Sequence, residues 1–586
     1  MTDSIDLTGA TTPPSAPEAG SGDATRVVYG TPVVPGVAWA PAAWTRRPPL
    51  PPETAPELPE DQREQGVADF ERAAAEVADG LNARAEAATG HVAEVLAVTA
   101  SLATDRAWKR EAAGRIRRGT PPVQATMAAT EKFVELFQKA GGLMEERTTD
   151  LRDVRDRVIA HLTGEPEPGI PVTGHPVVLL ADDLSPADTA GLDPVNYVAI
   201  ATQVGGPTSH TSIIARQLGI PCIVAARELA EIPEGAPVLV NAHEGSLTLG
   251  VDEAAARALV ADDADRVARI RAWRGPGRTA DGVSMQLLAN VQDGAGAVAA
   301  AGGQAEGIGL FRTELLFLNT QVEPSVDSQA GSYAPVFAAF PSQKVVVRTL
   351  DAGSDKPVPF ATLSEEFNPA LGVRGIRTTG QNPDLLVHQL DAVAQAAALQ
   401  PGTDVWVMAP MISTIPEARW FAGLVRERGL RVGIMIEVPA AAILIDQFLA
   451  EVDFVSIGTN DLTQYTMAAD RMSPHLAEYT DPWQPAVLSL IARTAEGGME
   501  AGKPVGVCGE AAADPLLACV LTGMGITSLS MAASAIPAVG AQLARVTIEQ
   551  CRAAAAAVVG AEDAGDARNR ARSAFETAPE EAPRQD

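Results

Sequence analysis

Between residues 60 and 163 the hydrophobic positions recur at steps of three and four, which is the spacing of one face of an α-helix. One such run begins at Val67 and Phe70, and another begins at Leu151 and Val154. A further helix between them is marked by Phe133, Leu136 and Phe137. Successive amphipathic helices bury their apolar faces against one another. The pattern therefore predicts a small helical bundle over residues 60–163.

Short apolar runs on either side of the bundle have the length of β-strands. They lie within residues 27–44, 176–181 and 197–202, and a helical pattern follows the last of them. This alternation predicts an α/β domain over residues 26–250. We expect the N-terminal strand to join the same sheet, which makes the bundle an insertion within the domain.

A different pattern fills the second half of the chain, where apolar or β-branched runs alternate with helical stretches. The eight runs are 283–291, 306–311, 344–350, 405–411, 431–438, 454–459, 504–509 and 526–531. Eight such repeats predict a C-terminal (β/α)8 TIM barrel over residues 279–560. The predicted fold class is thus multidomain α/β.

The remaining segments connect or flank these domains. Residues 251–278 are expected to link them, as an Ala- and charge-rich helix that is broken by RGPGR at 274–278, the expected hinge. Residues 1–25 and 561–586 are polar and rich in Ala, Pro and Glu, without periodic apolar positions. Such composition predicts disordered tails.

Charge, cysteine content and the N-terminal sequence restrict the classes of partner, the cysteine chemistry and the cellular location that we expect. The formal net charge of −29 argues against nucleic acid and anionic membranes, which select cationic surfaces, and favours a basic protein partner. The four cysteines lie far apart without CxxC spacing, which predicts neither disulfides nor a zinc site. The N-terminus is acidic and no apolar run has the length of a membrane span. We therefore expect a cytoplasmic protein without membrane insertion.

One histidine occupies a position that suits a phosphoryl carrier. His210 follows a Gly-Gly-Pro turn at the start of a predicted helix, where Thr208 or Ser209 can cap the helix. The positive end of the helix dipole favours the neutral, nucleophilic imidazole and stabilises a phosphate attached to it. A lone histidine beside a helix start is equally compatible with a purely structural role.

Polar and reactive residues end the successive strands of the predicted barrel. They are Asn290, Arg312, Arg348 with Asp351, Met411, Glu437, Asn460 with Asp461, Cys508 and Ser530. The loops that follow barrel strands converge at one face, so these side chains are expected to form an active site.

Arginines dominate this set and can clamp a polyanion. Arg312 and Arg348 end neighbouring strands, and Arg374 and Arg471 lie in later loops. Guanidinium groups bind phosphate and carboxylate oxygens bidentately and stay charged. Each arginine could instead pair with a nearby carboxylate.

Two carboxylates and one thiol complete the candidate chemistry. Glu437 and Asp461 end adjacent strands and suit the binding of Mg²⁺, whose coordination would be completed by substrate oxygens and water. Two carboxylates could instead form an acid/base pair. Cys508 is placed to give a proton to a carbanion-like carbon, or is a buried structural cysteine. Cys519 and Cys551, on predicted helices, fit a structural role.

Several motifs together resemble enzyme I of the phosphoenolpyruvate-dependent sugar phosphotransferase system. They are GGPTSHTSIIARQLGIP, GIGLFRTE, RTLDAGSDK, NPALGVRGIR, GIMIEVPAA, SIGTNDLTQYTMAADR and GVCGE. The resemblance extends from about residue 27 to 550 and also covers the wider phosphoenolpyruvate-utilising family, with pyruvate phosphate dikinase and phosphoenolpyruvate synthase. Those relatives carry a nucleotide-binding domain, and nothing here resembles one.

The resemblance implies a phosphotransferase that moves the phosphoryl group of phosphoenolpyruvate to His210 and then to the phosphocarrier protein HPr, releasing pyruvate as the first step of sugar uptake. It implies that Cys508 protonates the enolate and that Thr189 lies near the histidine. The implied substrate ligands are Arg312, Arg348, Asn460, Asp461 and Arg471, and the implied Mg²⁺ ligands are Glu437 and Asp461. The barrel is expected to form a homodimer.

In the family the bundle binds HPr, often with a histidine where this chain has Thr99, although the run DLRDVRDRV (150–158) matches. Two alternatives stay open. One is a relative of the dikinase or the synthase, and the other is a catalytically silent regulatory paralogue.

Overall fold

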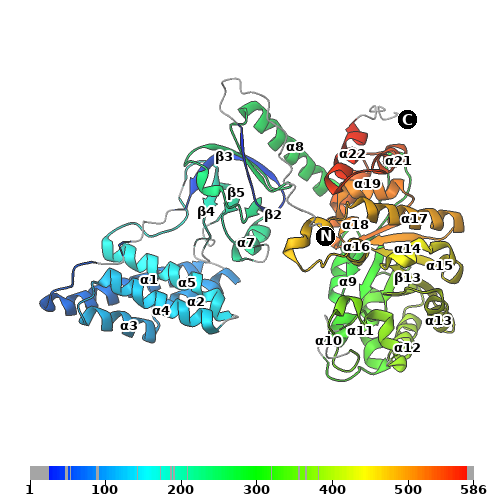
Figure 1. The fold of residues 1–586 in the computed structure, drawn as a ribbon, viewed down its shortest axis with the longest axis horizontal. Coiled ribbons are helices and arrows are strands. Elements are labelled where there is room, and N and C mark those ends of the chain that lie inside the picture. The colour runs from blue at the N-terminus through cyan, green and yellow to red at the C-terminus, as the bar shows by residue number, and fades with distance from the viewer. Residues whose placement is uncertain are drawn as a thin grey trace, which may run out of the picture. The chain divides into compact units, whose positions relative to one another are not determined.

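The computed structural model describes residues 25–45, 51–52, 55–87, 91–140, 143–171, 173–184, 188, 192–206, 209–318, 320–353, 357–362, 366–380 and 382–576. The chain divides into two compact units, residues 1–266 and 267–586 (Figure 1). The first unit contains the bundle and the mixed sheet, and the second contains the barrel.

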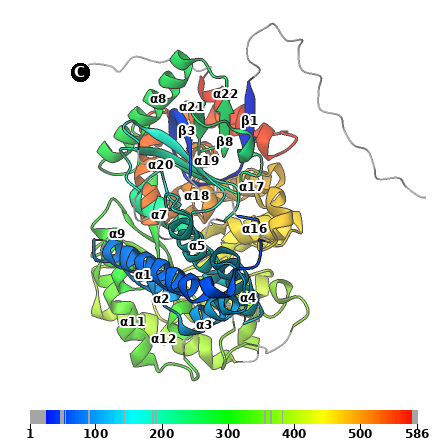
Figure 2. The same cartoon turned by 90° about the vertical axis from the view of Figure 1, so that its left-hand side faces the viewer.

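Five helices form the predicted bundle and lie side by side in both views (Figures 1 and 2). They are α1 (Arg63–Ala87), α2 (His91–Ala103), α3 (Arg106–Arg117), α4 (Pro122–Ala140) and α5 (Leu143–Thr163). The residues at helical spacing form its core, since Phe70, Leu81, Val154 and Val158 are all 1% exposed or less. The predicted helix marker Leu136 lies on α4 but is 49% exposed, so its apolar side chain does not join that core.

The sheet of the first unit has eight strands in the order β1-β8-β7-β3-β4-β5-β6-β2. They are β1 (Arg26–Tyr29), β2 (Thr31–Val34), β3 (Val37–Trp44), β4 (Val177–Ala181), β5 (Tyr197–Thr202), β6 (Cys222–Val224), β7 (Pro237–Asn241) and β8 (Ser246–Leu249). Strand β3 precedes the bundle in sequence and pairs in parallel with β4, which follows it. This pairing confirms that the bundle is inserted into the α/β domain.

The second unit is a closed barrel of eight parallel strands, as predicted. They are β9 (Gln286–Val291), β10 (Gly307–Arg312), β11 (Lys344–Arg348), β12 (Asp404–Ala409), β13 (Arg431–Ile436), β14 (Phe454–Gly458), β15 (Val505–Cys508) and β16 (Ser528–Met531). Each overlaps one predicted apolar run. The runs are continuous because both faces of each strand are buried.

Helices cover the outside of this barrel (Figure 1). They include α11 (Val326–Ala338), α12 (Pro383–Leu399), α13 (Ile415–Arg426), α17 (Pro485–Ala501), α19 (Pro515–Gly523) and α21 (Ile548–Ala557). Two helices that directly follow strands carry or adjoin site residues: α10 (Glu314–Leu318) after β10, and α16 (Thr459–Met467) after β14.

The predicted hinge segment RGPGR is bonded to the barrel. The N–H groups of Gly275 and Gly277 donate to the side chains of Gln304 at 3.1 Å and Glu306 at 2.9 Å. The Met285 N–H donates to the Gly277 carbonyl at 2.9 Å. The division between the two units falls earlier, after Arg266 within helix α8 (Glu253–Ala272).

The predicted C-terminal tail is wrong over part of its length, because residues Ala564–Glu576 form helix α22. Ala567 and Ala571, one turn apart, are buried, and Arg568 bonds to Asp481 at 3.0 Å and lies over the Trp483 ring. Small alanines bury a helix face without large apolar residues, which hides the helical pattern. Residues 1–24 and 577–586 lie outside the described part. No described helix is long and apolar enough to cross a membrane.

Candidate active site

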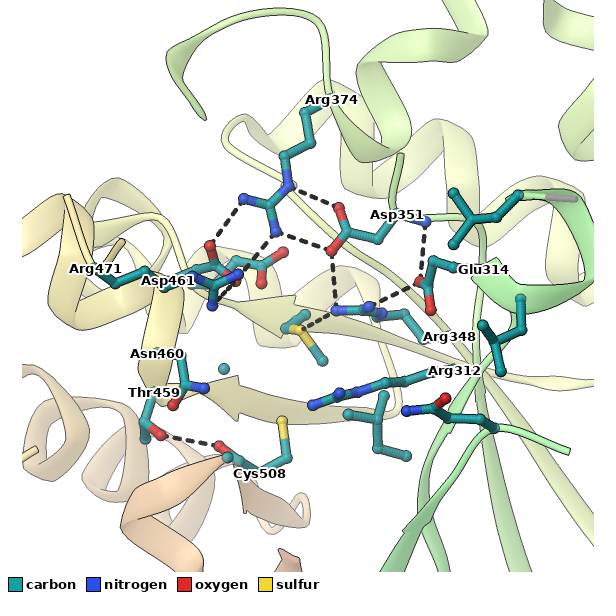
Figure 3. Close-up of a pocket in the computed structure, with 18 residues that line it drawn as sticks. Arg312, Glu314, Arg348, Asp351, Arg374, Thr459, Asn460, Asp461, Arg471 and Cys508 are labelled. Atoms are coloured by element: carbon teal, nitrogen blue, oxygen red, sulfur yellow. Dashed lines mark hydrogen bonds and ion pairs between the residues drawn. The ribbon is translucent and has the colours of Figure 1, made fainter. Parts of the chain in front are cut away.

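A cavity of about 280 Å³ opens among the loops that follow the barrel strands (Figure 3). Seven of the ten residues predicted at the strand ends line it: Arg312, Arg348, Asp351, Glu437, Asn460, Asp461 and Cys508. The other three, Asn290, Met411 and Ser530, do not line it, whereas the loop residues Arg374 and Arg471 do. The seven strand-end residues end or follow β10, β11, β13, β14 and β15, so the barrel topology brings together residues that are far apart in sequence.

The two strand-end arginines differ in their partners. Arg348 is 8% exposed and donates to Glu314 Oε1 at 2.8 Å, while its second terminal nitrogen lies 3.1 Å from Asp351. Arg312 has no hydrogen bond or ion pair with any described residue, and its side chain extends into the pocket toward Cys508 (Figure 3). Within the described part of the chain, the N–H donors of Arg312 are therefore available to an anion.

Arg374, expected to join the anion clamp, is instead bonded to carboxylates. Its guanidinium donates to both oxygens of Asp351 at 2.9 Å and to the oxygens of Asp461 at 2.8 and 3.1 Å (Figure 3). The alternative that each arginine pairs with a carboxylate therefore holds for Arg374 and also for Arg348, which pairs with Glu314 and Asp351. Arg471 lies near the same site, 3.8 Å from Asp461.

The carboxylates proposed as metal ligands are buried. Glu437 is 0% exposed, its Oε1 accepts the Met411 N–H, and its Oε2 has no hydrogen-bond partner. Burial and the nearby carboxylates of Asp351 and Asp461 raise the Glu437 pKa to about 8. A buried carboxylate oxygen without a donor fits a hard cation such as Mg²⁺. Among the described residues no cluster of three or more acidic, His or Cys side chains forms a complete metal cage.

Cys508 is held on the floor of the pocket. It is 3% exposed, and its thiol donates to the Ile457 carbonyl at 3.3 Å. Burial raises the pKa of this thiol to about 11, so it keeps its proton at neutral pH. Thr459 donates to the Cys508 carbonyl at 3.0 Å, and Asn460 Oδ1 accepts the Glu510 N–H at 3.3 Å.

Gly509 follows the cysteine in a conformation that requires glycine. Its φ is +105°, and an added Cβ would lie 2.7 Å from Thr459 Oγ1 and 2.9 Å from Asn460 Oδ1. The absence of a side chain lets Thr459 and Asn460 lie close to the backbone of Gly509. The GVCGE motif thus carries a structural requirement beside its thiol.

His210 lies in the other unit, as the first residue of helix α7 (His210–Leu218). The cap of this helix is Ser209, whose hydroxyl accepts the Ser212 N–H at 3.3 Å, which decides between the two predicted caps. Thr208 and Thr189 lie outside the described residues. The helix start is where unpaired N–H groups stabilise an anion.

Two features of the bundle bear on the predicted partner surface. Thr99 is 0% exposed, so its side chain is not part of any exposed face. In the run 150–158, Arg157 is also fully buried and bonds to Asp153 at 2.8 Å, Glu167 at 2.9 Å and Asp188 at 3.3 Å. This arginine thus ties α5 to the segments that lead back to the sheet.

Sequence reasoning missed Glu314 and the role of Asp351. Glu314 accepts from Arg348 and also from the Asp351 N–H at 3.3 Å, and so fixes the arginine against the strand end. The available signal was its position two residues after Arg312 in GIGLFRTE, since a residue directly after a strand end faces the same pocket.

Family models match most of this architecture. Residues 29–147 match the N-terminal domain, residues 173–245 the mobile domain and residues 269–548 the phosphoenolpyruvate-binding domain of the phosphoenolpyruvate-utilising enzymes. Fold, pocket and matches together define a phosphoenolpyruvate-utilising enzyme.

Individual relatives show which family of phosphoenolpyruvate-utilising enzymes the chain resembles. A phosphoenolpyruvate-protein phosphotransferase of Streptomyces coelicolor is 47% identical over 513 residues, which cover 87% of this chain and 92% of the relative. A protein of the same name from Haloferax volcanii is 40% identical over 75% of this chain and 79% of its own length. Another from Geobacillus stearothermophilus is 37% identical over 71% of this chain and 75% of its own length. The chain therefore belongs to the phosphoenolpyruvate-protein phosphotransferase family, enzyme I, which confirms the resemblance of its motifs.

Proposed function

We propose that this enzyme transfers the phosphoryl group of phosphoenolpyruvate to His210 and from there to a histidine of HPr, as the first step of sugar uptake by the phosphotransferase system. The observation that carries the proposal is the barrel pocket, where Arg312, which has no anionic partner among the described residues, lies near buried acidic groups and a protonated thiol. A small, highly charged phosphate ester suits this set of groups.

In this proposal the substrate phosphate binds to Arg312, Arg348 and Arg471. Arg312 can donate its N–H groups to the phosphate. Arg348 is held by Glu314, so little side-chain entropy of Arg348 is lost when the phosphate binds. Asn460 and Asp461 complete the substrate contacts.

We propose that Glu437 and Asp461 would hold Mg²⁺, a hard cation that prefers oxygen ligands. When bound, it supplies positive charge to the phosphate and enolate oxygens. The unpaired Glu437 Oε2 supports this assignment.

The proposed reaction breaks the bond between phosphorus and the enol oxygen, and a ring nitrogen of His210 forms a new bond to phosphorus. The electron pair of the broken bond remains on the enolate, and Cys508 delivers the proton that converts the enolate into pyruvate. The thiol is suited to this step because its raised pKa keeps the proton available at neutral pH. Solvent then restores the proton.

The acceptor HPr is proposed to bind the helical bundle through residues other than Thr99, which is buried. A pocket that admits a three-carbon phosphate does not admit a folded protein, so His210 visits two sites. Domain motion is therefore part of the proposed mechanism. We also propose that the barrel forms the homodimer and that the enzyme acts in the cytoplasm.

The test is incubation with ³²P-labelled phosphoenolpyruvate and Mg²⁺, with and without HPr. We expect acid-labile label on the wild type, its transfer to HPr, and no label on His210→Ala, which retains phosphoenolpyruvate binding. Label retained by His210→Ala would contradict the assignment of the acceptor. Dependence on a nucleotide would favour the dikinase or synthase alternative, and absence of any transfer would favour the silent regulator.

A further inference from the structure

Arg374 is bonded to two carboxylates of the barrel pocket at once. Its guanidinium donates two hydrogen bonds to Asp351 and two to Asp461, between 2.8 and 3.1 Å (Figure 3), and a longer one of 3.4 Å to the Tyr465 hydroxyl. The arginine side chain is 3% exposed, and those of Asp351 and Asp461 are 1% and 9% exposed. Away from water, each carboxylate needs a positive partner, and one guanidinium supplies it to both.

Another carboxylate of this pocket, Glu437, forms no ion pair with any described residue. Glu437 is fully buried, and no described donor reaches its Oε2. The pocket thus contains an arginine-bound carboxylate, Asp461, and a carboxylate oxygen of Glu437 without a donor. These are the two side chains to which the proposed function assigns Mg²⁺, and the inference rests on that assignment.

We propose that Arg374 takes the place of the metal ion at Asp461 in the metal-free enzyme and releases this carboxylate when Mg²⁺ binds. The guanidinium stays attached to Asp351 through Nε and Nη2, because this pair of bonds does not involve the metal ligand. Nη1 and Nη2, which donate to Asp461 at 2.8 and 3.1 Å, are then available to an anionic oxygen of the substrate.

This exchange couples the two binding events. Mg²⁺ frees a donor for the anion, and the anion attracts that donor away from the metal ligand. By linkage, each ligand then raises the affinity for the other by the same factor. Arg374 is a positioning residue in the metal-free state and becomes a substrate contact after the exchange.

The experiment is calorimetric titration of the full-length chain with MnCl₂ alone, without phosphoenolpyruvate. Arg374→Gln removes the competing ion pair, and we expect about tenfold tighter Mn²⁺ binding, the factor that corresponds to loss of one charged hydrogen-bonded pair. Repeating the titration with phosphoenolpyruvate present should tighten Mn²⁺ binding more in the wild type than in Arg374→Gln.

Arg377→Gln is the matched control. It removes the same charge from the same loop, but Arg377 donates to the Gly372 carbonyl at 3.3 Å and to Ser413 Oγ at 2.9 Å. This control should bind Mn²⁺ like the wild type. Arg374→Lys keeps the charge without spanning both carboxylates, so its Mn²⁺ affinity should fall between those of the wild type and Arg374→Gln.

Equal or weaker Mn²⁺ binding by Arg374→Gln, in a variant whose thermal unfolding matches that of Arg377→Gln, would overturn the exchange. If Arg374→Gln does not fold, unchanged Mn²⁺ affinity in Arg374→Lys overturns it. Labelling of the wild type by phosphoenolpyruvate tests the proposed function separately. A wild type that is labelled, with unaltered Mn²⁺ affinity in the Arg374 variants, contradicts the exchange alone.

Discussion

Arg312 and Arg348 end neighbouring strands, yet their surroundings predict different consequences of substitution. We expect Arg312→Ala to lower the rate of His210 phosphorylation by about 10²-fold, because it removes preorganised charge from the phosphate site. It should leave stability unchanged, since Arg312 has no bonded partner among the described residues. Arg348→Ala should show a similar loss of rate and also lower stability by about 3 kcal/mol, because Glu314 loses its buried ion-pair partner.

Rapid-quench labelling and urea unfolding measure the two effects. The interpretation is contradicted if both variants unfold at the wild-type urea concentration, or if Arg312→Ala retains the full rate.

The Cys508 thiol, whose pKa burial raises to about 11, predicts a selective defect at the protonation step. Cys508→Ala should slow pyruvate formation by about 10²-fold, the usual contribution of a positioned proton donor. The control is Cys519→Ala, which removes another buried thiol, one that donates to the Pro515 carbonyl at 3.3 Å on α19. Coupled lactate dehydrogenase measures pyruvate. A wild-type rate in Cys508→Ala would leave this cysteine with a packing role.

At the scale of elements, His161 joins the end of α5 to α1 and to the segment that follows α5. Its ring nitrogens each lie 2.9 Å from a carboxylate, Glu76 on α1 and Glu167 after α5. Glu167 also accepts from Arg84 and Arg157. Burial lowers the His161 pKa, but the hydrogen bonds to the two glutamates outweigh it, and the net shift is upward from 6.5.

A histidine whose pKa is higher in the folded than in the unfolded state stabilises the folded protein at pH values below its unfolded-state pKa. This stabilisation is lost as the pH rises through the folded-state pKa. We therefore expect His161→Gln to lower the melting temperature of the bundle more at pH 6 than at pH 9. Calorimetry at both pH values measures the difference. The control is His388→Gln, since His388 is bonded to the single carboxylate of Glu323. An equal loss at both pH values would contradict the role of the ion pairs.

At the scale of the whole molecule, the proposed acceptor and the proposed donor pocket belong to different compact units. A fragment of residues 26–273 contains the bundle, the sheet and α8. We expect it to fold alone and to exchange phosphoryl groups between His210 and phosphorylated HPr. It should not react with phosphoenolpyruvate, because it lacks the barrel. Labelling of the fragment by phosphoenolpyruvate would show that the donor site is elsewhere.

The position of the pivot between the two sites remains a prediction. The structure favours testing it in helix α8 rather than in RGPGR. RGPGR is bonded to the barrel through Gly275 and Gly277, whereas the N-terminal part of α8 is bonded to the sheet unit, since Asp263 accepts the Val37 N–H at 3.0 Å. The part of α8 after Arg266 lies between these anchors.

The sequence by itself determined the order of elements and most of the charged residues that line the pocket, but not Glu314. Barrel strands are buried on both faces and therefore appear in the sequence as apolar runs. Because the carboxyl ends of these strands converge, the candidate residues from Arg312 to Cys508 could be assigned to one pocket without knowing any distance between them. The inserted bundle could be predicted for the same reason, since helical periodicity is a local property.

Only the tertiary structure decided which charges neutralise one another. Arg374 pairs with Asp351 and Asp461, whereas Arg312 has no partner among the residues that the structure describes, although the sequence analysis assigned both arginines to the same anion clamp. Burial of Thr99 and the helix at Ala564–Glu576 were likewise invisible in the sequence. Ion pairing and burial depend on neighbours contributed by distant segments, whereas periodicity and strand-end position are written in adjacent residues.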